Sequence, residues 1–117
     1  MCVVSLDVQS NSPVVVGSTV TFHATLCNLN TSFLNDSFVY VWINYAVNHS
    51  TDLFDITTTT AGTTANMSKV FSVRVLPGHY LMEVRAFRKL RHVWLMAFKH
   101  LRPLAVGYHN FTLTGIL

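Results

Sequence analysis

The side chains that could do chemistry in this sequence are few and scattered. General acid–base catalysis needs two carboxyl groups that converge, but most of the five acids lie in separate polar stretches. They are Asp7, Asp36, Asp52, Asp55 and Glu83. The six histidines include no pair at i, i+2 or i, i+4, the spacings that place two imidazoles on one metal ion, and no Gly-X-Ser-X-Gly nucleophile motif occurs. The sequence therefore predicts no enzyme, no metal site and no cofactor.

The most concentrated feature is a basic segment between residues 85 and 102. It contains six of the eight Lys and Arg residues, namely Arg85, Arg88, Lys89, Arg91, Lys99 and Arg102. Two structures fit this segment. We prefer a hairpin of strands 80–87 and 93–98 with a basic tip at 88–92. The alternative is an amphipathic helix with an apolar stripe made of Phe87, Leu90, Trp94, Ala97, Phe98 and Leu101.

Clustered basic side chains attract polyanions without a fitted pocket. The segment is therefore a candidate patch for acidic glycans or anionic lipid head groups. A net charge of only +3 argues against nucleic acid as a partner. The simpler alternative is a solvated hairpin edge whose charges prevent pairing with other chains.

Glycan acceptors are the most frequent motif. Asn-X-Ser/Thr occurs at five of the eight asparagines, which are Asn30, Asn35, Asn48, Asn66 and Asn110. With 22 Ser and Thr residues in the chain, about 1.5 such motifs would arise by chance. The excess predicts a glycosylated chain in the secretory lumen or outside the cell.

Two cysteines, Cys2 and Cys27, flank a segment expected to fold back on itself around residues 13–17. Such a fold would bring its ends together, so we expect a disulfide between them. Two unpaired, small apolar side chains are the alternative. No run approaches the roughly 20 apolar residues that span a bilayer, so we expect any signal peptide or membrane span to lie outside this chain.

Length and alternation predict one all-β domain over residues 1–117. Strands are expected at 3–8, 14–16, 19–26, 38–43, 69–75, 80–86 and 110–117, the last with an alternative start near Leu104, and a short edge strand is expected at 53–56. The threonine run 57–60 and Ala61-Gly62 are expected to form a loop. About seven strands at this spacing predict an antiparallel sandwich of two sheets.

The segment at 38–43 is apolar on both faces, as a central strand would be. Trp42 is therefore expected to anchor the core between the sheets, against Phe22, Tyr80 and Val84.

Three stretches of the sequence resemble PKD (polycystic kidney disease) domains, which have an immunoglobulin-like sandwich fold. The first resembles the opening of the domain, the second its tryptophan strand and the third the entry to its penultimate strand. They are Ser12-Pro13-Val14-Val15-Val16-Gly17-Ser18-Thr19-Val20, Phe38-Val39-Tyr40-Val41-Trp42 and Val75-Leu76-Pro77-Gly78-His79-Tyr80. Where PKD domains usually have Asp-Phe-Gly-Asp-Gly after the tryptophan, this chain has Ile43-Asn44-Tyr45-Ala46-Val47.

The resemblance implies a lumenal or extracellular module of a membrane glycoprotein, similar to those of melanocyte glycoproteins, with Trp42 and Tyr80 as core anchors. We expect a non-catalytic spacer or adhesion domain whose partners are other protein domains or further copies of itself. The alternatives are a polyanion-binding domain, which would use the basic segment, and a fragment of an immune or viral immunoglobulin-like receptor.

Overall fold

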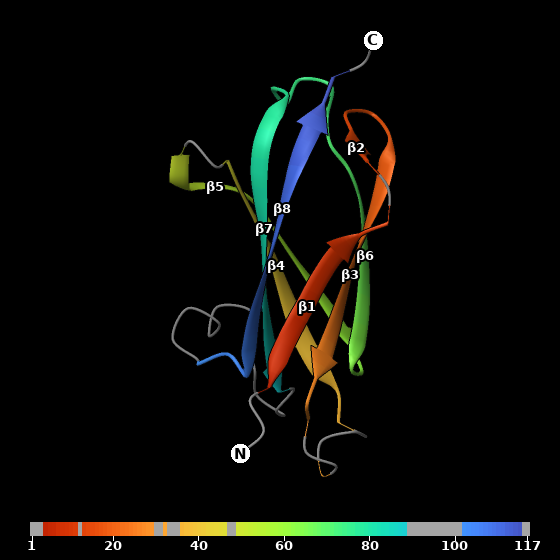
Figure 1. The fold of residues 1–117 in the computed structure, drawn as a ribbon, viewed down its shortest axis with the longest axis vertical. Coiled ribbons are helices and arrows are strands. Elements are labelled where there is room, and N and C mark those ends of the chain that lie inside the picture. Colours follow the sequence, from red (N-terminus) through yellow and green to blue (C-terminus); the bar gives the residue numbers. More distant parts are fainter. Residues whose placement is uncertain are drawn as a thin grey trace.

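The computed structural model describes residues 4–11, 13–29, 32, 36–46, 49–88 and 102–115, and for 49–54 it describes the backbone only. Its strands are β1 (Ser5–Ser10), β2 (Val14–Val15), β3 (Thr19–Cys27), β4 (Phe38–Ala46), β5 (His49–Ala61), β6 (Thr64–Val70), β7 (Gly78–Arg88) and β8 (Ala105–Thr114). They form a three-stranded sheet in the order β1-β3-β6 and a five-stranded sheet in the order β2-β8-β7-β4-β5. The two sheets face each other as a sandwich (Figure 1), which confirms the all-β prediction.

The core lies between the two sheets because alternate residues of each strand point inward. In β3 the inward positions Val20, Phe22, Ala24 and Leu26 are all buried, as the alternation predicts. Trp42 is 1% exposed and belongs to the same core cluster as Phe22, Tyr80 and Val84. The prediction that Trp42 anchors the core is confirmed.

Phe111 of β8 is the centre of the aromatic packing in this core. Its ring lies 5.4 Å from that of Phe22, 5.6 Å from that of Phe71 and 5.9 Å from that of Tyr80, measured between centroids. β8 therefore connects the two sheets through side chains that come from distant parts of the sequence.

Tyr80, near the start of β7, forms a hydrogen bond to the segment that connects the two sheets. Its hydroxyl donates a hydrogen bond to the backbone carbonyl of Leu76, four residues earlier, at 2.5 Å. A tyrosine at the start of a strand that bonds back to the preceding chain in this way is a tyrosine corner, which is common in immunoglobulin-like sandwiches.

The prediction of a loop at 57–60 is wrong, because these threonines belong to β5. They pair with β4 in the register from Phe38↔Ala61 to Ile43↔Ile56. β4 is apolar on both faces and central, so it needs a neighbour on each side, and β-branched threonine suits a strand. The polar composition of the run therefore led to the wrong assignment.

The strand expected at 69–75 is also wrong in its limits. β6 ends at Val70, and residues 71–77 cross from one sheet to the other without strand structure. Val73 and Leu76 are 63% and 78% exposed, so the alternation of apolar residues there does not mark a buried face. The residues of β6 that enter the core are Ala65 and Met67.

The preferred hairpin between 80–87 and 93–98 does not fit the sheet. β7 pairs with β4 along one edge and with β8 along the other, from Gly78↔Leu113 to Ala86↔Ala105. A strand has only two edges, so β7 has no free edge along 80–86 for the expected partner. The rest of that prediction, including the helical alternative, falls on residues 89–101, which lie outside the described residues.

The sheets approach each other closely where β1 crosses β8 at Gly107. A Cβ atom added to Gly107 would lie 2.5 Å from the carbonyl oxygen of Leu6 and 2.8 Å from Cγ2 of Val8. Only glycine leaves room for this contact, so Gly107 determines how closely the sheets can pack.

Candidate functional site

Two of the five predicted glycan acceptors, Asn66 and Asn110, are among the described residues. Asn30, Asn35 and Asn48 lie outside them. Asn66 is exposed on the outer face of β6, and its Oδ1 atom lies 2.5 Å from Nδ1 of His23. Met67, the middle residue of the motif, is buried, while the Ser68 hydroxyl lies on the outside, 3.0 Å from that of Thr21.

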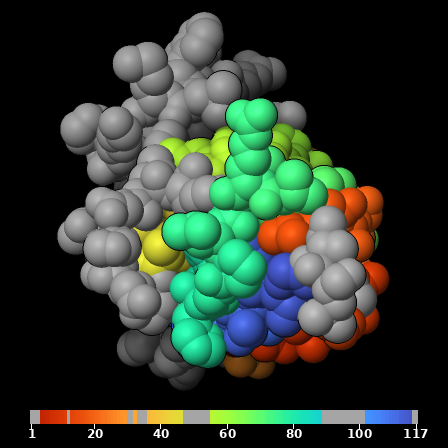
Figure 2. All heavy atoms as spheres, turned by 90° about the horizontal axis from the view of Figure 1, so that it is seen from above, coloured from red at the N-terminus to blue at the C-terminus, as the bar shows by residue number. Residues whose placement is uncertain are grey.

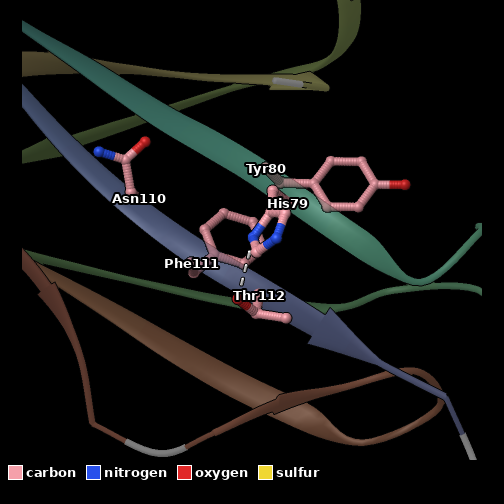
Figure 3. A pocket seen from close by; sticks show the side chains of 5 residues that line it. All are labelled: His79, Tyr80, Asn110, Phe111 and Thr112. Carbon is pink, nitrogen blue, oxygen red and sulfur yellow. Dashed lines mark hydrogen bonds between the residues drawn. The ribbon is translucent and has the colours of Figure 1, made fainter. Parts of the chain in front are cut away.

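The second acceptor, Asn110, has the same arrangement on β8. Asn110 and Thr112 are exposed, while Phe111 between them points into the core. These residues line a shallow hollow of about 320 Å³ together with His79 and Tyr80 (Figure 3). The Thr112 hydroxyl lies 3.3 Å from Nδ1 of His79. A glycan on either asparagine would therefore extend outward without disturbing the core.

A second hollow, of about 500 Å³, lies on the outer face of the three-stranded sheet. It is lined by Gln9, Ser10, Asn11, His23, Ala24, Thr25, Thr64 and Asn66. Nearly all of these side chains are polar, and none carries a full charge when histidine is neutral. Because Asn66 is part of this lining, a glycan attached there would lie over the hollow.

The predicted disulfide is not found. Cys27 has a free thiol, and Cys2 lies outside the described residues. The expected antiparallel pairing of β1 with β3 does form, but it places Ser5 opposite Cys27. In this register the residue opposite Cys27 is a serine and not a cysteine.

The basic segment is described only at its ends, because Lys89, Arg91 and Lys99 lie outside the described residues. Nε of Arg85 is 2.9 Å from Oε2 of Glu83, and Nε of Arg88 is 2.9 Å from Oδ2 of Asp36. Arg102 is exposed. Two of the six basic side chains are therefore already paired with carboxylates.

A polar cluster that the sequence did not predict lies on the outer face of the five-stranded sheet. It consists of Tyr45 from β4, Glu83 and Arg85 from β7, and Tyr108 from β8. Burial raises the pKa of Tyr45 above its ordinary value, the negative charge of Glu83 raises it further, and the positive charge of Arg85 lowers it. Apolar Val41 and Ile43 beside the cluster are almost completely buried.

A hydroxyl–imidazole contact between Ser10 and His109 also went unpredicted, because 99 residues separate the two in sequence. Oγ of Ser10 lies 3.2 Å from Nε2 of His109. The imidazole stacks against Phe111, with ring centroids 6.3 Å apart, and meets the edge of Phe22 at 6.2 Å. Burial lowers the pKa of His109. The imidazole therefore packs beside the aromatic residues of the core and is itself partly exposed.

Within the described part of the chain, no three His, Cys, Asp or Glu side chains lie close enough together to hold a metal ion. The same residues contain no helix that is long and apolar enough to cross a membrane. No protein-family model matches the chain, and no curated protein matches it as a relative.

Proposed function

We propose that this chain is an immunoglobulin-like, PKD-like module of a lumenal or extracellular membrane glycoprotein, and that it acts as a non-catalytic spacer or protein-interaction domain. Three structural features support the immunoglobulin-like assignment. They are the division of strands between the sheets, the parallel pairing of β2 with β8, and the tyrosine corner at Tyr80.

The path of the chain through the molecule is the observation that carries the spacer role. The molecule measures 49 × 27 × 23 Å, and β1 begins near one end of the long axis while β8 finishes near the other (Figure 1). A domain with this path separates the sequences on its two sides by its full length. Successive modules can then follow one another in a line, which is how extracellular sandwich domains are commonly arranged.

The end where β8 finishes supports an interaction role. Gly78 pairs with Leu113, so the 71–77 connection lies beside the last residues of β8. In the view onto this end, the connection and the end of β8 together form much of the surface (Figure 2). Exposed Val73 and Leu76 give this end an apolar character that suits contact with another domain.

The outward position of both described acceptors supports the glycoprotein part of the proposal. Asn66 lies on one sheet and Asn110 on the other, each at an exposed position. Glycans on both would cover opposite faces and leave the two ends of the long axis open. The ion pairs of Arg85 and Arg88 favour the reading of the basic segment as a solvated surface rather than a polyanion site.

The experiment is expression of the chain behind a cleavable signal peptide in a secretory host. We expect several glycoforms that an endoglycosidase reduces to one band. Asn66→Gln and Asn110→Gln should each shift the pattern down by one glycan, whereas Asn11→Gln, which lies outside any acceptor motif, should not. A folded, secreted protein without any glycan would contradict the proposal.

A further inference from the structure

β5 presents an open sheet edge of unusual composition. It is the last strand of the five-stranded sheet, and along 56–61 it pairs with β4 on one side and with no other described strand. The sequence there is Ile-Thr-Thr-Thr-Thr-Ala, in which five consecutive residues are β-branched and none is charged or proline. Unpaired backbone groups on such an edge can bond to another strand.

The remaining sheet edges carry features that discourage pairing. At the other end of the five-stranded sheet, β2 is only two residues long and pairs with Leu113 and Thr114 alone, and β1 passes close over the rest of β8 at Gly107. At the edges of the three-stranded sheet, β1 carries Asp7, and β6 carries the acceptor Asn66 and Lys69, which forms an ion pair with Asp55. Short strands and charged side chains are the usual protections of an edge. The 56–61 part of β5 has neither.

The side chains of this part of β5 leave the edge accessible. Thr59 points toward the core, because its hydroxyl accepts a hydrogen bond from Nε1 of Trp42. Alternation then places Thr58 and Thr60 on the outer face with Ile56, which is 37% exposed. Every residue of the run is partly or fully exposed.

We propose that a second copy of this chain adds its own β5 to this edge, so that two five-stranded sheets join into one continuous sheet. A two-fold axis brings identical edges together in antiparallel orientation, as an antiparallel ladder requires. With the axis at Thr58, residue 56 faces 60 and residue 57 faces 59 of the other copy. Asp55 then faces Ala61, so that no like charges are opposed.

This pairing rests on the proposed function only because it gives the interaction module a specific binding surface. The contact uses backbone hydrogen bonds of β5 and involves neither Asn66 nor Asn110. The test is therefore made on the full chain after enzymatic removal of its glycans, and its result does not depend on the glycosylation experiment.

The experiment is sedimentation over a concentration series. We expect the unmodified chain to form a concentration-dependent dimer. Thr58→Lys and Thr58→Glu should each weaken it about five-fold or more, because two like charges would meet at the axis. An equimolar mixture of the two variants should restore it, because Lys and Glu would then be opposite. Thr25→Lys, the same change on the central strand β3, should leave the dimer unchanged.

Circular dichroism and thermal unfolding establish that each variant is folded. If Thr58→Lys does not fold, the double variant Ile56→Lys/Thr60→Lys takes its place and Ile56→Glu/Thr60→Glu is its counterpart, because residue 56 faces residue 60 of the other copy and both are exposed. A chain that stays monomeric at the highest concentration would overturn the proposal. It would also be overturned by a dimer that Thr58→Lys leaves intact, or by a mixture of charged variants that stays monomeric. Slower amide exchange at 56–61 with rising concentration is the expected independent sign of pairing.

Discussion

Nε1 of Trp42 donates a hydrogen bond to the hydroxyl oxygen of Thr59 at 3.0 Å, which joins the core of the sandwich to the threonine run of β5. The indole lies in the core at 1% exposure, so its N–H needs a partner inside the protein. Thr59 provides that partner only because β5 pairs with β4 in the observed register, with Tyr40 opposite Thr59.

Removal of the indole should therefore lower the free energy of unfolding more than removal of its hydrogen-bond partner. We expect Trp42→Ala to lower the free energy of unfolding by about 3 to 5 kcal/mol and Thr59→Val by about 1 to 3 kcal/mol, since the latter leaves a buried donor unpaired. Thr25→Val, at an exposed site, should stay within about 0.5 kcal/mol of the original. Denaturant unfolding measures all three. An unaltered Trp42→Ala transition would contradict the core position of Trp42.

The tyrosine corner should contribute a smaller amount. Tyr80→Phe keeps the ring that packs on Phe111 but removes the hydroxyl that bonds to Leu76. We expect a loss of about 1 kcal/mol in unfolding free energy. Tyr108→Phe makes the same chemical change at a residue that is 59% exposed and should have no measurable effect. Equal losses in the two variants would mean that the corner bond does not stabilise the fold.

A methyl group at Gly107 should separate the sheets. Gly107→Ala would place Cβ against the backbone of Leu6, which cannot move aside as a flexible side chain can. We expect a loss of about 1 to 3 kcal/mol, measured by chemical denaturation. At Gly62 an added Cβ has no heavy atom within 4 Å, so Gly62→Ala is the matched control and should change little. If the two variants unfold alike, the contact between β1 and β8 is not as close as described.

Alkaline pH should destabilise the fold through Tyr40. Burial raises the pKa of Tyr40 from 10.0 to about 12, and its hydroxyl donates a hydrogen bond to the Gly62 carbonyl at 2.6 Å. The folded state thus holds a proton that the unfolded chain loses first. The contribution is complete below pH 10 and is lost as the pH rises toward about 12. The stability difference between the original chain and Tyr40→Phe should narrow over that interval, and a constant difference would contradict the assignment.

Mildly acid pH should also destabilise the fold, in this case through His109. Burial lowers the pKa of this imidazole below its ordinary value of 6.5, so the unfolded chain binds a proton more readily than the folded one. The contribution to stability is complete above pH 6.5 and declines as the pH falls through the folded pKa. His109→Gln should remove this slope in unfolding experiments between neutral and acid pH. Parallel pH profiles for the two proteins would show that His109 is not buried.

The sequence determined the features that depend only on the pattern of residues within one strand. Strict alternation in β3 predicted its buried face, and the apolar run of β4 predicted a central strand with Trp42 in the core. The reversal of the chain around residues 13–17 was predicted as well, and the structure has a turn there in which the backbone N–H of Ser18 donates to the carbonyl of Val15. Each of these inferences depends only on neighbouring residues and the period of two in a strand.

Tertiary structure alone decided the features that depend on which strands become neighbours. The threonines of β5 have a polar composition that fits a loop equally well, and only their pairing with β4 makes them a strand. β7 pairs with β8 across a long stretch of sequence, and Ser10 meets His109 across 99 residues. Gly107 is needed because β1 passes over it. Pairing between distant segments is a property of the whole packed sandwich, so no local pattern in the sequence encodes it.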